Sequence, residues 1–200
     1  MKKILSMSLL VIAILLSACG SNEAAKKITP ADDVSVFCNA ILHFDCNSLQ
    51  KIGMTLEEYE QSFIDGFGQS LVKSSGIAFS DEQVKRINDA VIDVLKRTQF
   101  IVETVSENGG NAKVKITTDT LEQFNETLLM SRIPANISSM SDTEKIDAFA
   151  NAMADALKNL KKVDQTEFLI DCRYDEENKM WVPVQLENFA DVLFSKVFKF

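Results

Sequence analysis

The spacing of hydrophobic residues divides the chain into a helical part and a strand-rich part. Between residues 30 and 97, apolar side chains recur every three or four positions, which predicts amphipathic helices. Four start signals mark these helices: Pro30 followed by two aspartates, an aspartate N-cap before a short second helix, and capping boxes that begin at Thr55 and Ser80. Gly66 and Gly68 weaken the third helix and predict close packing or a kink there.

The period changes to two after residue 99. Alternation over 100–105 and 112–117 predicts two strands, and Asn108-Gly109-Gly110 between them is a hairpin turn signal. A second hairpin is predicted from strands over 168–174 and 180–184. Further helices are predicted over 120–130, from Ser141 to about residue 160, and over 186–197.

Helices that come first, followed by antiparallel hairpins with a helical segment between them, are typical of an α+β layer. We therefore expect a curved antiparallel sheet of about four strands, packed on one face against several helices. About 170 residues remain for this structure once the N-terminal segment discussed below is set aside, which is the size of one domain. The expected domain spans residues 31–200.

One apolar segment near the N-terminus follows neither period. The mainly apolar run from Ile4 to Leu16 comes directly after Lys2 and Lys3. Its roughly 13 positions are too few for the roughly 20 that a membrane-spanning helix needs. A charged start, a short apolar run and the small residues 17 and 18 are instead the pattern of a secretory signal peptide over residues 1–18.

The end of this segment, Leu16-Ser17-Ala18-Cys19, resembles the lipobox of bacterial lipoprotein signals. The resemblance implies that Cys19 is lipidated on its sulfur, becomes the mature N-terminus and holds the protein to a membrane by acyl chains. Residues 19–30, which lack apolar periodicity at their start, then form a flexible tether. The expected location is the bacterial cell envelope, at the inner or the outer membrane. The alternative is a plain secretory signal that leaves Cys19 unmodified.

Charge restricts the class of partner. The chain has 21 Lys and Arg against 29 Asp and Glu, and removal of the signal takes two lysines, which leaves 19 against 29 and a net charge of −10. Such an acidic domain lacks the basic surface that nucleic acids require, and an anionic membrane surface repels it. We expect no nucleic-acid partner, and membrane contact through the lipid on Cys19.

The remaining cysteines are odd in number: Cys38, Cys46 and Cys172. In a continuous helix the first two would lie about 12 Å apart, beyond disulfide reach, so a bond between them needs a chain reversal. Three alternatives stay open: buried free thiols, a Cys38–Cys46 bridge, and a Cys38–Cys172 bridge. We expect at least one thiol to be free but protected from alkylating reagents in the folded protein.

Motifs for catalysis and for metal or cofactor binding are missing. His43 is the only histidine, so a two-histidine zinc site is impossible, and its place near the end of the first helix favours interaction with the helix dipole. Asp171 is the nearest candidate for a catalytic carboxylate, but alternation puts it on the strand face opposite Phe168 and Ile170, toward solvent. We expect no enzyme activity, no metal and no cofactor.

Three segments of the chain resemble bacterial lipoprotein domains: Ala40–Asp45, Leu49–Met54 and Glu177–Val184. Those domains look like the cystatin-like cone that nuclear transport factor and ketosteroid isomerase share. Enzymes of that cone use a carboxylate in its mouth as a base. Tyr174 and Trp181 either line an apolar pocket at the open end of such a cone or fill the core. The expected function is non-catalytic binding of an envelope protein, a peptide or a small apolar ligand; the alternative is a cone enzyme with a lone carboxylate acting on a hydrophobic substrate.

Overall fold

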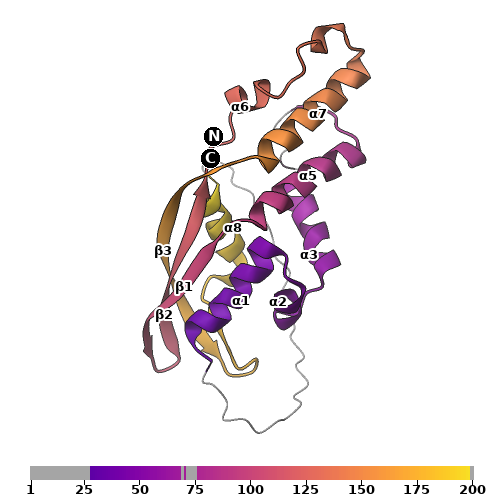
Figure 1. Ribbon diagram of the computed structural model, residues 1–200. Helices are drawn as coiled ribbons and strands as arrows, with labels where there is room; N and C mark the ends of the chain where they lie inside the picture. The colour runs from indigo at the N-terminus through magenta and orange to yellow at the C-terminus, as the bar shows by residue number, and fades with distance from the viewer. Residues whose placement is uncertain (1–27, 69, 71–75, 199–200) are drawn as a thin grey trace.

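A computed structural model describes residues 28–68, 70 and 76–198 (Figure 1). The predictions for the signal peptide, for Cys19 and for most of the tether lie outside the described residues. Within them, the order is α1 (Pro30–His43), α2 (Cys46–Lys51), α3 (Leu56–Phe63), the π-helix η1 (Ile64–Gly68), α5 (Asp81–Leu95), β1 (Phe100–Asn108), β2 (Asn111–Leu121), α6 (Glu126–Met130), the 3₁₀-helix η2 (Ile137–Ser139), α7 (Asp142–Lys158), β3 (Lys162–Asp175), β4 (Met180–Pro183) and α8 (Leu186–Val197).

The sheet is a four-stranded antiparallel meander in the order β1-β2-β3-β4. Gly109 and Gly110 join β1 to β2 with φ values of 56° and 82°, a left-handed pair that glycine adopts without strain. The predicted α+β fold and the first hairpin are confirmed. Helix α1 lies on the inner face of the sheet, and the other helices gather on the same side, while the opposite face carries none in the described part (Figure 1).

Helix α1 shows that the sheet is curved. Its Ala31 N–H donates to the Thr104 hydroxyl oxygen on β1 at 3.1 Å, and its Asp33 carboxylate accepts from the Trp181 N–H on β4 at 2.8 Å. Since β1 and β4 are the opposite edges of the sheet, the strands must bend around α1 to bring both edges to it. This curvature places one helix at the centre of the core.

Side-chain caps start the helices where the sequence predicts them. Capping boxes are present at Thr55 before α3, at Ser80 before α5 and at Ser141 before α7, and Asp45 accepts from the Ser48 N–H at the start of α2. Each cap satisfies N–H groups that the first turn of a helix leaves unpaired. Local chemistry therefore sets these boundaries.

Near Gly66, where the sequence predicts close packing or a kink, α3 continues directly as the π-helix η1. A cluster of aromatic rings packs here. Phe63 lies 5.5 Å from Phe44, 5.3 Å from Phe67 and 6.0 Å from Phe194, measured between ring centroids. The cluster thus joins the first helices to α8 at the C-terminus.

The predicted helix over residues 120–130 is wrong. Strand β2 continues to Leu121, and only Glu126–Met130 forms a helix, which is capped by Asn125. The strand is extended because Thr118, Asp119 and Thr120 are buried and pair with β3. Polar residues in a buried strand hide the period of two that would have revealed it.

The outer face of the sheet is charged and exposed to solvent. Lys115 on β2 pairs with Glu103 on β1 at 2.7 Å and lies 3.9 Å from Glu167 on β3. Ile101 and Leu169 are the apolar residues beside this ladder, and both are more than half exposed. Such a face is typical of an antiparallel sheet that is covered on one side.

Among the helices of the described residues, none combines the length and the apolar character that crossing a membrane would require.

Candidate functional site

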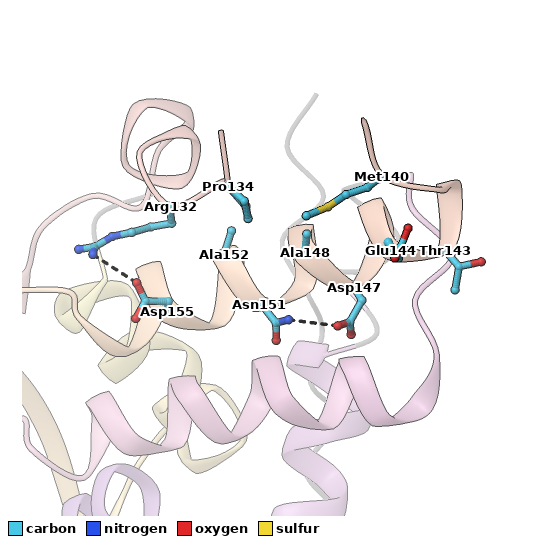
Figure 2. A pocket seen from close by; sticks show the side chains of 10 residues that line it. All are labelled: Arg132, Pro134, Met140, Thr143, Glu144, Asp147, Ala148, Asn151, Ala152 and Asp155. Atoms are coloured by element: carbon cyan, nitrogen blue, oxygen red, sulfur yellow. Dashed lines mark hydrogen bonds and ion pairs between the residues drawn. The ribbon is translucent and has the colours of Figure 1, made fainter. Parts of the chain in front are cut away.

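A groove runs along α7 beneath the segment that connects α6 to it. The groove has a volume of about 570 Å³. Figure 2 shows Pro134 and Met140 on the connecting segment, facing Ala148 and Ala152 on the helix. The two alanines are one helical turn apart and give the groove a shallow apolar floor, because their side chains end at Cβ. The size is within the range of pockets that bind small molecules and short segments.

Charged side chains border this floor. Arg132 pairs with Asp155 at 3.3 Å across the groove, and Glu144 accepts hydrogen bonds from the Ser141 hydroxyl and N–H. Asp147 accepts from Asn151 at 3.1 Å (Figure 2) and, on the side toward α5, from Arg86 at 3.1 Å. The groove therefore combines an apolar floor with three carboxylates and one cation among its lining residues.

Two of the three carboxylates of the groove, Asp147 and Glu144, are held in their charged form by hydrogen bonds. Hydrogen bonds from Gln83 and Arg86 lower the pKa of Asp147, and the hydroxyl and N–H of Ser141 lower the pKa of Glu144. Hydrogen bonds to an ionised carboxylate favour that form. Asp147 and Glu144 are consequently charged at neutral pH.

The aromatic pair proposed from the sequence lies elsewhere. Trp181 is 4% exposed and packs edge-on against the half-buried Tyr174, with ring centroids 5.4 Å apart. Both are on the inner face of the sheet near the start of α1, and neither lines the groove along α7. Their role as ligand-binding residues stays a prediction.

His43 ends α1, as expected, and is half buried. Its Nε2 donates to the Thr98 carbonyl oxygen at 2.7 Å, and its Nδ1 lies 3.0 Å from Asn39 Oδ1. The ring lines a second cavity of about 500 Å³, together with Lys96 and Gln99 among others. Because both ring nitrogens already have partners, His43 is placed as a connector between α1 and the start of β1.

Asp171 lies on the outer face of β3, as the alternation predicts. Its side chain is 72% exposed, and its Oδ1 is 3.7 Å from Lys113 Nζ. On the inner face of the same strand, the neighbouring Cys172 is 1% exposed. An exposed, ion-paired carboxylate has the environment of an ordinary surface group.

The carboxylate that sequence reasoning missed is Asp33. It is 7% exposed, and its Oδ2 accepts from the Trp181 N–H. Burial raises its pKa, and this outweighs the opposing effect of that hydrogen bond. Its position four residues before Phe37, on the apolar face of α1, was the available signal. Asp33 lines neither of the two cavities described above.

Asp33 gives a prediction about stability and pH. A carboxyl group whose pKa is higher in the folded than in the unfolded protein binds its proton more tightly when folded, so its contribution to stability falls as pH rises through that interval. Asp33→Asn keeps an acceptor for Trp181 and removes this effect. We expect the Tm of Asp33→Asn, measured by circular dichroism, to increase relative to the Tm of the wild type as pH is raised from 3 to 7.

Asp33→Ala is the matched comparison. It leaves the buried Trp181 N–H without an acceptor, which costs about 1–3 kcal/mol at every pH. If the Tm of the wild type instead increases relative to that of Asp33→Asn as pH rises, the folded protein stabilises the Asp33 carboxylate. That result would refute the raised pKa of Asp33.

The three remaining cysteines differ in exposure. All three are free thiols in this structure; Cys38 and Cys172 are buried, whereas Cys46 is exposed at the start of α2. The chain does reverse at Phe44, whose φ of 53° is left-handed, but the reversal turns Cys46 outward. The Cys38–Cys46 alternative therefore has no support from this arrangement.

Comparisons with known proteins give one structural match to report. A scan against protein-family models finds no match, and a search of curated proteins finds none. The crystal structure of a candidate lipoprotein, ycdA, from Bacillus subtilis subsp. subtilis strain 168 is similar, with a TM-score of 0.66 and 15% sequence identity. The match covers 86% of this chain and 56% of that chain. This likeness shows a shared fold, while the cone family named from the sequence is not confirmed.

Proposed function

We propose that the chain is a membrane-anchored envelope lipoprotein whose α+β domain binds a peptide segment of another envelope protein without catalysing a reaction. The anchor rests on Cys19 after Leu16-Ser17-Ala18. A fold shared with a candidate lipoprotein agrees with this anchor. Two acyl chains on Cys19 would be sufficient for stable residence at a membrane.

The absence of catalysis is proposed from the surroundings of the candidate groups. Asp171 is exposed and paired with Lys113, and both ring nitrogens of His43 have partners. Asp33 is the best remaining candidate for a cone enzyme's base, since it is buried and its pKa is raised. Its Oδ2, however, accepts the backbone N–H of Trp181, which favours a structural role.

The observation that carries the binding proposal is the groove along α7. Ala148 is partly exposed and offers apolar surface that a ligand's side chains can cover, while Ala152 beside it is 3% exposed. Met140 on the opposite wall has the flexible side chain common at adaptable binding surfaces. The three carboxylates of the groove outnumber the two arginines that pair with them, Arg132 and Arg86, and this favours a ligand that is positively charged. The partner of best fit is a peptide segment with apolar and basic residues.

A titration with three labelled model peptides tests this groove. The peptides share the same apolar residues and differ only in carrying lysine, glutamine or glutamate at the polar positions. We expect the protein, placed in neutral-lipid nanodiscs, to bind the lysine peptide at least about tenfold more tightly than the glutamate peptide, with affinity falling as salt rises. Fluorescence anisotropy gives the Kd, and empty nanodiscs give the background.

Ala148→Trp should fill the groove and abolish binding of the lysine peptide. Ala78→Trp is the matched control, because residue 78 is an exposed alanine outside the groove. Equal loss in both variants, or no preference among the three peptides, would contradict the peptide-binding proposal. Either result would leave the anchor unaffected, since that rests on Cys19.

A further inference from the structure

Two of the three cysteines that are not assigned to lipid lie at the same interface in the core. Cys38 is on α1 and is 0% exposed, and Cys172 is on β3 and is 1% exposed. The side chain of Cys172 points to the inner face of the sheet, since its neighbours Asp171 and Arg173 are exposed. Cys172 therefore faces the side of the sheet on which α1 lies, and Cys38 is buried on that helix.

Helix α1 runs in the same direction as β4. The start of α1 is fixed to β1 by the bond from Ala31 to Thr104, and its end by the bond from His43 to Thr98, which lies two residues before β1. The helix is thus antiparallel to β1. Successive strands of the sheet are antiparallel, so β4 is antiparallel to β1 as well.

The hydrogen bond from the Trp181 N–H on β4 to Asp33 on α1 fixes how far along the strand each residue of the helix lies. From Asp33 to Cys38, the helix advances about 7.5 Å at about 1.5 Å per residue. From Trp181 to Pro183, strand β4 advances about 6.6 Å at about 3.3 Å per residue. Pro183 pairs directly with Cys172. Cys38 and Cys172 consequently lie at the same level of the core.

The pKa values of the two thiols agree with a short distance between Cys38 and Cys172. Burial raises the pKa of the Cys38 thiol far above its ordinary value, and the neighbouring Cys172 adds to the rise. Burial likewise raises the pKa of Cys172 to about 12. Since the thiolate is the reactive form, both groups are inert once the domain has folded. A bond between them has to form while the chain is still folding.

We propose that Cys38 and Cys172 form a disulfide when the chain folds in an oxidising compartment, and that Cys46 remains a free, exposed thiol. The protected free thiol expected from the sequence would then exist only in the reduced protein. Two thiols lose two protons and two electrons to a disulfide oxidant, which leaves as two thiols while one S–S bond forms in the core. The bond would join α1 to β3, and it closes a long loop, the case in which a disulfide constrains the unfolded chain most. Only its cellular setting rests on the export that we propose above.

The test uses the protein extracted from membranes in detergent, reduced in denaturant and refolded in a buffer of oxidised and reduced glutathione. Free thiols are blocked with N-ethylmaleimide, and tryptic peptides are analysed without reduction. We expect residues 28–51 to be linked to residues 163–173 in most of the protein. Reduction of the refolded protein should then lower the Tm by roughly 10 °C.

Two variants identify the cysteine that takes part, because residues 28–51 contain both Cys38 and Cys46. Cys46→Ser should keep the linked peptides, and Cys38→Ser should lose them. The proposal is overturned if Cys38 and Cys172 are recovered as separate alkylated thiols after refolding, or if the link survives in Cys38→Ser and disappears in Cys46→Ser.

Discussion

Cells supplied with an alkyne fatty-acid analogue are expected to label the wild-type protein, and Cys19→Ala is expected to carry no label at all. The reason is that lipid attaches to the sulfur of Cys19, which alanine lacks, and that cleavage before residue 19 depends on this modification. The variant should therefore also accumulate as an uncleaved precursor, visible as a larger band on a gel. The loss should be complete, because the lipobox resemblance involves Cys19 alone among the four cysteines.

Cys46→Ala is the control for this experiment, since Cys46 is an exposed thiol in the folded domain. It should be labelled and processed like the wild type. Equal labelling of Cys19→Ala and the wild type would show that acylation occurs elsewhere, and an unlabelled wild type cleaved at the same place would favour the plain secretory signal.

Phe63→Ala is expected to lower the free energy of unfolding by about 4 kcal/mol, the largest effect on stability that we predict. Phe63 is 1% exposed and contacts three other aromatic rings, from Phe44, Phe67 and Phe194. Its removal leaves a cavity where the first helices meet α8. Urea unfolding followed by circular dichroism measures the change.

Two further variants separate packing from other causes. Phe63→Leu fills part of the cavity and should recover about half of the loss, as expected for a volume effect. Leu169→Ala on the outer face should change stability by less than about 0.5 kcal/mol, since Leu169 is 57% exposed. A similar loss from Leu169→Ala and from Phe63→Ala would contradict the placement of the core.

The sequence was sufficient for elements whose start is encoded in neighbouring residues. The capping boxes at Thr55, Ser80 and Ser141 involve side chains three residues apart, so a helix start is visible without knowledge of the fold. The turn at Gly109 and Gly110 is local for the same reason. Alternation along β3 likewise placed Asp171 on the outer face.

Features that depend on distant partners were not predictable. Asp119 is buried at the end of β2 because Lys162 on β3 pairs with it at 2.6 Å and the Gln99 N–H donates to it, and neither partner is close in sequence. The groove along α7 forms because the segment between α6 and α7 folds back over Ala148 and Ala152, and no local sequence pattern predicts that fold. Asp33 looks like a helix-start residue until the Trp181 N–H is placed beside it.

Mass spectrometry of the mature N-terminus tests whether Cys19 carries the lipid anchor. Trypsin should release residues 19–26, Cys19-Gly20-Ser21-Asn22-Glu23-Ala24-Ala25-Lys26, from the protein purified from membranes. We expect this peptide to begin at Cys19 and to carry at least a diacylglyceryl group on its sulfur. An unmodified Cys19 peptide, or an N-terminal peptide that still contains the residues before Cys19, would contradict this expectation.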